Sequence, residues 1–276
     1  MLAALIVVFR EVIEAGIVVG IVMAATKAVA YRGQWVAGGV TAGFLGACLV
    51  ALFVEAITAA FAGMGQELFN AAVLGIAVVM LAWHNVWMAQ HGREIAAEML
   101  ALGRSVAAGS RTLLALAVVV GIAVLREGAE VVLFLYGIVA AEGGWSSSIL
   151  LGGLAGLVLG GMVSLLTYIG LLRVPGRYLF AVTSVMLSFL AAGMAAQAIG
   201  FLEKADIITV LNTQLWDSSG ILSDSSLLGK VLHTLIGYND RPSGMQVLIY
   251  LATLAIIYFL MKVTAPPPIP AHIRRP

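Results

Sequence analysis

Long apolar stretches recur along the whole sequence, and they constrain the fold more than any other feature. A helix needs about 20 mostly apolar residues to cross the hydrocarbon core of a bilayer. Stretches of roughly this length, separated by short polar or glycine-rich joints, cover residues 2–26, 36–62, 69–90, 113–140, 148–172, 178–202 and 244–262. Only 11% of the residues are charged, which is too few to cover a soluble globule. The sequence therefore predicts an all-α integral membrane protein with seven transmembrane helices.

Other features of the composition exclude several classes of function. A formal net charge of +1 offers no general attraction for nucleic acid. The single cysteine, Cys48, rules out an internal disulfide framework and a cysteine-based metal cluster. The chain has no Gly-x-x-x-x-Gly-Lys-Ser/Thr loop, so it does not hydrolyse ATP by that route. The first apolar stretch is not a cleavable signal peptide, because ionisable residues lie in its middle.

The lysines and arginines outside the apolar stretches predict the orientation in the membrane. Ten of them lie on one side of the seven-span topology: Lys27, Arg32, Arg93, Arg104, Arg111, Arg173, Arg177, Lys262, Arg274 and Arg275. The other side has only Lys204, Lys230 and Arg241. Because cytoplasmic connections carry the excess of positive charge, we expect the amino terminus outside and the carboxyl terminus in the cytoplasm.

Two charged motifs interrupt the apolar stretches. The pattern Arg-Glu-x-x-Glu occurs at residues 10–14 and again at residues 126–130. Each ionisable group in the middle of a span costs about 2.5 to 3.5 kcal/mol on the insertion scale. On a helix the arginine and the second glutamate are i,i+4 neighbours, so one arginine can brace two carboxylates on the same face. Intramembrane ionisable groups are functional by default, although ion pairs that only hold helices together are the alternative interpretation.

The motifs belong to an internal repeat. A shift of 116 residues aligns them and also matches Ile6 with Ile122 and Val8 with Val124, while glycines 38, 39 and 46 correspond to glycines 152, 153 and 160. Three spans separate the two copies, so the copies are expected to cross the membrane in opposite directions, as in inverted-repeat transporters. The predicted organisation is a first three-helix repeat (1–92), a cytoplasmic connection (93–112), a second, inverted repeat (113–202), an extracytoplasmic loop (203–243), a seventh helix (244–264) and a cytoplasmic tail (265–276).

The motifs predict a cation site near the middle of the membrane. Four carboxylates and two arginines leave a net charge of minus two, which a small cation can neutralise. The candidate metal ligands are Glu11, Glu14, Glu127 and Glu130, and the supporting residues are Arg10 and Arg126. Glu14 and Glu130 are expected to face each other and share an ion. Carboxylate oxygen suits magnesium, calcium, manganese and iron, and no cysteine lies near the motifs to favour a softer metal.

The sequence resembles the ferroxidase-coupled high-affinity iron permeases of bacteria and fungi, which carry Arg-Glu-x-x-Glu twice in seven spans. The segments Leu215–Ser219 and Gly237–Pro242 also resemble the extracytoplasmic signature of the bacterial members. The resemblance implies a cytoplasmic (inner) membrane protein that takes up ferric iron as its substrate, with no permanently bound cofactor. It also implies an external ferroxidase or iron-delivery protein as partner. The chain departs from the family at Asn70, where relatives often carry an acidic residue.

Further polar residues are candidates for a relay or for the entrance of the ion. These are Glu55, Glu67, Asp217 and Asp224. A hydrogen-bonded structural role for the first, and a solvated loop face for the two aspartates, are the alternatives. His84, which lies between Trp83 and Trp87, is expected near a helix end rather than at a metal, because a lone histidine lacks metal-ligand spacing. Leucines and a valine at 227–235 suggest an interfacial helix in the loop.

Two other functions fit part of this pattern. A secondary transporter of ferrous iron or manganese is possible because oxygen ligands and net charge do not choose between oxidation states. An intramembrane di-metal enzyme fits poorly, since such sites add Glu-x-x-His and no histidine follows a glutamate at that spacing.

The seven-span topology is testable with reporters. A reporter fused after Pro276 should read cytoplasmic, and one inserted in the 203–243 loop should read extracytoplasmic. Both reporters on the same side of the membrane would contradict the predicted topology.

Overall fold

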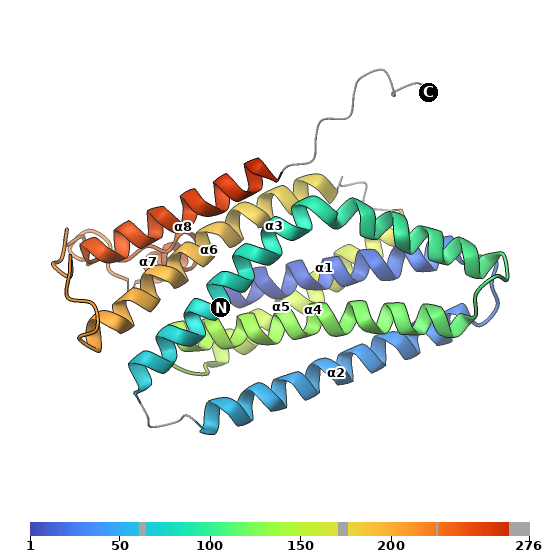
Figure 1. Cartoon of the computed structure of the whole chain (residues 1–276), viewed down its shortest axis with the longest axis horizontal. Helices are drawn as coiled ribbons and strands as arrows, with labels where there is room; N and C mark the ends of the chain where they lie inside the picture. Colours follow the sequence, from blue (N-terminus) through green and yellow to red (C-terminus); the bar gives the residue numbers. More distant parts are fainter. Residues whose placement is uncertain (61–64, 171–175, 225, 265–276) are drawn as a thin grey trace, which may run out of the picture.

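The computed structural model describes residues 1–60, 65–170, 176–224 and 226–264, and long α-helices dominate it. The helices lie side by side in an elongated bundle, with the short α7 at one end (Figure 1). Their bounds are α1 Leu2–Ala25, α2 Arg32–Ala60, α3 Gln66–Ala107, α4 Leu113–Glu142, α5 Ser147–Tyr168, α6 Gly176–Lys204, α7 Leu227–Ile236 and α8 Gly244–Val263. One isolated bridge, Gln214 to Ser243, is the β-structure found in this part of the chain. The all-α prediction is confirmed.

Five of these helices are long and apolar enough to cross a membrane. They comprise α2 and α5, the segments Gln66–Gly92 of α3 and Ala181–Lys204 of α6, and α8. Helices α1 and α4 are also long, with 24 and 30 residues, but each contains a charged motif. The protein is therefore a multi-pass membrane protein. Positions 61–62 and 171–172 of two predicted spans, and the predicted tail 265–276, lie outside the described residues.

Helix α3 is longer than the sequence suggested. The prediction ended this span at residue 90 and treated 93–112 as a connection, but the helix continues to Ala107 and has 42 residues. At 1.5 Å per residue it is roughly 63 Å long, twice the thickness of a hydrocarbon core. Alanine, leucine, methionine and glutamate, all strong helix formers, dominate 94–102 and extend the helix beyond the apolar stretch.

The closest helix pairs are α1 with α5 and α2 with α4, so each motif-bearing helix packs against the second helix of the other half. Glycines make this close approach possible. A Cβ atom at Gly43 would lie 2.5 Å from the carbonyl oxygen of Gly121, and one at Gly156 would lie 2.6 Å from that of Leu5. The contact is of the kind that small residues, repeated at fourfold spacing, allow between membrane helices.

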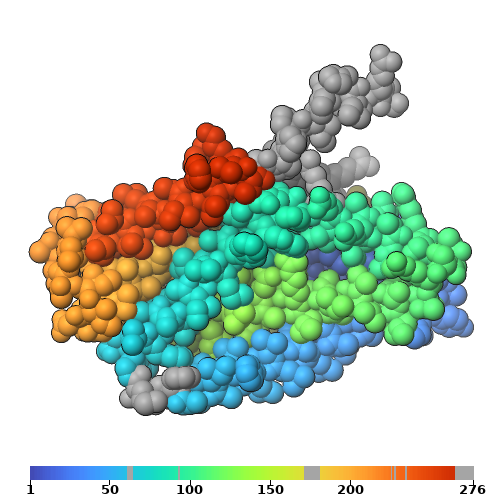
Figure 2. All heavy atoms as spheres, in the orientation of Figure 1, coloured from blue at the N-terminus to red at the C-terminus, as the bar shows by residue number. Residues whose placement is uncertain are grey.

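The outer surface of the bundle is strongly apolar, as a lipid-facing surface should be. On α2, for example, Leu49, Leu52 and Phe53 are each about two-thirds exposed. The face seen in Figure 2 is formed mainly by α2, α3, α4 and α8, with the segment that follows α6 at one end. The helix predicted in the 203–243 loop is present as α7, where the Ser226 hydroxyl caps its first turn by accepting from the amide of Gly229.

A pair of glycine variants on α5 tests the close helix contact. Gly156→Val would place its side chain against the backbone of α1, which cannot move aside, and overpacking of this kind costs about 1–3 kcal/mol. We expect its melting temperature in detergent to fall by several degrees. The control is Gly161→Val, because a Cβ there has no neighbour within 4 Å. Equal stability of the two variants would contradict the role of Gly156.

Candidate metal centre

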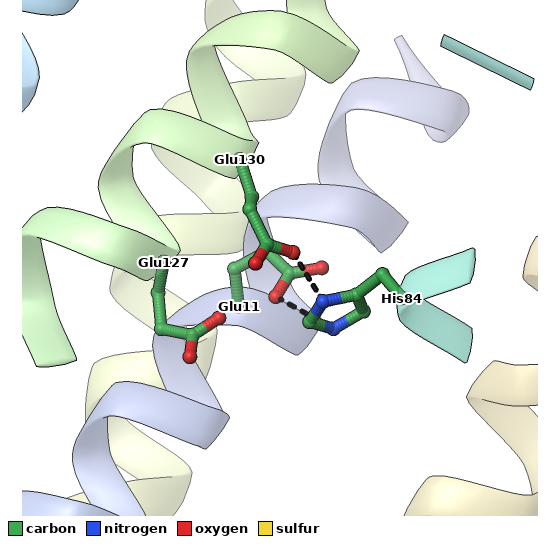
Figure 3. Close-up of side chains that lie close together, drawn as sticks. All are labelled: Glu11, His84, Glu127 and Glu130. Carbon is green, nitrogen blue, oxygen red and sulfur yellow. Dashed lines mark ion pairs between the residues drawn. The ribbon is translucent and has the colours of Figure 1, made fainter. Parts of the chain in front are cut away.

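The two charged motifs meet in the interior of the bundle. Helices α1 and α4 run in opposite directions and contact each other (Figure 1). Glu11 comes from α1, Glu127 and Glu130 come from α4, and His84 comes from α3 (Figure 3). One ligand atom from each of these four residues lies within 4.8 Å of the ligand atoms of the others. Residues from three different helices thus present a compact set of oxygen and nitrogen donors.

Each arginine forms ion pairs with the two glutamates of its own motif, as the helical spacing predicts. Arg10 Nε lies 2.8 Å from Glu14 Oε1, and Arg10 Nη1 lies 3.9 Å from Glu11 Oε1. In the second motif Arg126 Nε lies 3.1 Å from Oε1 of the second glutamate and 4.0 Å from Oε1 of the first. The longer distance to the first glutamate in each motif leaves that carboxylate less neutralised than the second.

The two motifs differ in burial. The side chain of Arg10 is 2% exposed, whereas that of Arg126 is 37% exposed. Arg126 also stacks over the ring of Trp87, with 4.2 Å between the guanidinium carbon and the ring centroid. A cavity of about 290 Å³ opens beside this motif. Its lining residues are Met80, Trp83, His84, Trp87, Arg126 and Glu130. The site is therefore accessible from the α3 and α4 side and closed on the α1 side.

His84 lies between the two motifs. Because it is in the interior of α3, the prediction that it lies near a helix end was wrong. The residue is only 3% exposed. Its Nε2 lies 3.5 Å from Glu11 Oε2 and 3.4 Å from Glu14 Oε2, and its Nδ1 pairs with Glu130 Oε2. The expected direct meeting of Glu14 with Glu130 is thus bridged by an imidazole. The rule that singled out the motifs, that an ionisable residue inside a span is functional, would have identified His84 as well.

Neighbouring side chains hold His84 in this position. The adjacent Asn85 donates from Nδ2 to the carbonyl oxygen of Ser184 and to the hydroxyl of Ser188, both at 3.1 Å, and so ties α3 to α6. The ring of Phe134 meets the imidazole edge-on, with ring centroids 6.4 Å apart. These contacts fix the turn of α3 from which the imidazole projects toward α1 and α4.

The centre has more acceptors than donors. Four carboxylates face two guanidinium groups and one imidazole. Among the residues that the structure describes, neither carboxylate oxygen of Glu11 has a hydrogen-bond donor, and Oε2 of Glu127 has none. Buried carboxylates without donors are costly, and a cation that coordinates them removes that cost. Carboxylate oxygen together with imidazole nitrogen is a donor set that suits iron and manganese.

The two candidate relay residues in the spans lie outside this cluster. Glu55 is on the exposed side of α2, where its carboxylate accepts a hydrogen bond from the hydroxyl of Tyr136 on α4. Glu67 is exposed in the first turn of α3, and Asn70 is half-buried one turn later. A relay or entrance role for either glutamate stays a prediction.

The two candidate aspartates lie in the loop between α6 and α8. Asp217 Oδ2 is 3.2 Å from Arg241 Nε, and hydrogen bonds from Ser219 hold the pKa of Asp217 below its usual value. Asp224 is half-buried, and burial raises the pKa of its carboxyl. Neither aspartate belongs to the four-residue cluster, so their roles in ion entrance also stay predictions.

A multi-helix membrane bundle with carboxylates from two antiparallel helices converging in its interior is typical of a cation transporter. Sequence comparison is more specific. The chain belongs to the iron permease FTR1 family, whose sequence profile matches residues 1–265. The family resemblance drawn from the motifs is confirmed.

Curated relatives match along almost the whole chain. The ferrous iron permease EfeU of Escherichia coli O6:K15:H31 (strain 536 / UPEC) is 31% identical over 269 residues, which cover 95% of this chain and 96% of the relative. The protein of the same name in Shigella sonnei (strain Ss046) has the same identity and coverage. The one in Yersinia pestis is 31% identical over 268 residues, or 94% of each chain. No solved structure matches the chain.

Removal of the imidazole tests whether His84 belongs to the metal centre. In purified protein we expect His84→Gln to weaken Mn²⁺ or anaerobic Fe²⁺ binding at least tenfold, about 1.4 kcal/mol, because glutamine lacks the nitrogen donor. The matched control is His91→Gln, two turns along the same helix, where the ring contacts Trp87 and not the carboxylates. Equal affinities in the two variants would exclude His84 as a ligand.

Proposed function

We propose that this chain imports iron across the bacterial cytoplasmic membrane through the metal centre between α1, α3 and α4. Glu11, Glu127, Glu130 and His84 are the ligands in this proposal. Glu14, Arg10 and Arg126 support these ligands, because they set the net charge of the site and the orientation of the ligand side chains. The observation that carries the proposal is the convergence of both Arg-Glu-x-x-Glu motifs on one set of ligand atoms within 4.8 Å.

The glycine contacts support an inverted repeat as the scaffold of this centre. Gly39 meets Ala117 and Gly43 meets Gly121, while Gly152 meets Met1 and Gly156 meets Leu5. Shifts of 116 residues on the motif helix and 113 on the glycine helix turn one set of pairs into the other, so Gly39 corresponds to Gly152 and not to Gly153 as the sequence match had it. Inverted repeats commonly hold their substrate near the midplane, where the two halves meet. We propose seven spans in this arrangement, with the amino terminus outside and the carboxyl terminus in the cytoplasm.

The different burial of the motifs supports transport rather than static binding. One side of the centre is closed around Arg10, and the other opens into the cavity beside Arg126. A carrier that exposes its site to one side at a time requires such an asymmetry between related halves. In the proposed cycle the two motifs exchange these environments as iron crosses the membrane.

Ferric iron, received from an external ferroxidase or iron-delivery protein, is the substrate that the family resemblance implies. The carboxylate-rich donor set favours such a hard, highly charged ion.

Ferrous iron is the second candidate, and a specific observation favours it. The imidazole of His84 is a softer donor than carboxylate and suits ferrous iron. The Escherichia, Shigella and Yersinia relatives are also named ferrous iron permeases.

Uptake of radioactive iron by a bacterial strain without its own iron importers tests the proposal. We expect Glu11→Gln and Glu127→Gln each to reduce uptake per folded molecule at least a hundredfold, because the amide keeps the shape and loses the ligand charge. Glu98→Gln is the control, since that residue is exposed on the extension of α3. Preserved uptake per folded molecule in the motif variants would show that the motifs are structural ion pairs.

The same assay separates the two oxidation states. With ferric substrate, uptake should depend on the oxidase partner and fall when ascorbate keeps iron reduced. With ferrous substrate, ascorbate should preserve or raise uptake without the partner.

A further inference from the structure

We propose that His233, Glu142 and Gln197 form a second iron-binding position, an outer site that receives the ion before it reaches the metal centre. This inference rests on the proposed import function. The three residues come from α7, the end of α4 and the outer half of α6, and they line one small cavity.

The cavity lies at the end of the bundle where α1 begins and α4 ends. Its volume is about 30 Å³, enough for one metal ion in place of a water molecule. Ala3 and Met194 form part of its apolar wall. Ala3 precedes Glu11 by eight residues, so the cavity lies roughly 12 Å from the metal centre along α1. In the predicted orientation this is the extracytoplasmic side.

His233 is oriented as a ligand. Its Nδ1 lies 2.6 Å from the carbonyl oxygen of Tyr238, which can only accept, so Nδ1 carries the proton of the neutral ring. The lone pair of Nε2 then accepts a hydrogen bond from the side-chain amide of Gln197, and an ion that binds Nε2 would replace this hydrogen bond. Metal-binding histidines characteristically donate their other ring nitrogen to a backbone carbonyl, which fixes both the tautomer and the ring orientation.

The other two polar residues add oxygen donors to the same cavity. Gln197 Oε1 is buried and has no hydrogen-bond partner among the described residues, and rotation of the amide on ion binding would turn this oxygen toward the ion. The Glu142 carboxylate is 35% exposed and forms a loose ion pair, 3.5 Å from the amino group of Met1. One nitrogen and two kinds of oxygen donor suit Fe²⁺.

The competing acidic groups of the nearby loop are less suitable. Asp217 is already paired with Arg241 and hydrogen-bonded by Ser219. Asp224 does not line the cavity, although it lies close enough to His233 for the two to interact electrostatically. Asp224 is therefore placed to guide an ion toward the outer site rather than to hold it there.

A layer of apolar side chains separates the outer site from the metal centre. Val7 and Phe134 are fully buried, and each lies one helical turn from a motif glutamate, on the side facing the cavity. Leu190 of α6 packs in the same core cluster. An ion cannot cross this layer without movement of the helices, so a position that holds it outside until the layer opens gives the carrier a loading step.

Ion counting on the full-length purified chain tests the outer site. Equilibrium dialysis against Fe²⁺ under argon should give two ions per chain for the parent protein and one for His233→Gln and for Glu142→Gln. The control His91→Gln should keep two. An unchanged count in either outer-site variant, with the parent's elution profile on gel filtration, would overturn the proposal. Two different substitutions guard against misfolding of one of them.

Uptake kinetics distinguish this inference from the proposed function. The outer-site variants should raise the half-saturating external iron concentration about tenfold and leave the maximal rate unchanged, because the metal centre is intact. If the parent chain imports no iron but the variants still lose one bound ion, the proposed function fails and the outer site stands. If the motif variants abolish uptake while the outer-site variants match the parent in ion count and half-saturation, only the outer site is wrong.

Discussion

Four carboxylates inside an apolar helical bundle, three of them buried and Glu130 partly buried, are the constraint on which the rest of this structure depends. Each charged group inside a membrane span costs about 2.5 to 3.5 kcal/mol on the insertion scale, and the groups also repel one another. Arg10 and Arg126 offset part of this cost through ion pairs at 2.8 and 3.1 Å. His84 contacts three of the four carboxylates. Oxygens of Glu11 and Glu127 still lack hydrogen-bond donors among the described residues, which favours a bound cation.

The packing of the bundle follows from the need to bring the two motifs together. Glycine contacts at Gly43 and Gly156 let α2 approach α4 and let α5 approach α1. This leaves the opposite faces of α1 and α4 free to meet each other and α3. The small residues thus set the distances between the helices, and the charged residues lie in the space between those helices.

Much of this arrangement could be predicted from the sequence, because its determinants are local. Apolar length identified the membrane helices, and the i,i+4 spacing identified the pairing of Arg10 with Glu14. The position of His84 could not be derived in that way, since its approach to Glu11 and Glu130 depends on how three distant helices cross. The length of α3 was also missed, because Arg93, Glu94 and Glu98 interrupt the apolar stretch and helix formation there depends on propensity rather than hydropathy. The cavity beside His233 depends on the position of α7 against α6, which no sequence periodicity specifies.

The central claim is that both motifs build one metal centre, and a double-mutant cycle between Glu11 and Glu127 tests it most directly. Affinity for Mn²⁺ would be measured on folded parent protein, Glu11→Gln, Glu127→Gln and the double variant, each in the Glu142→Gln background so that the outer site does not contribute. A shared centre predicts that either single change removes most of the affinity, so that the double loss is much smaller than the sum of the single losses. Single losses that add in the double variant would contradict a shared site.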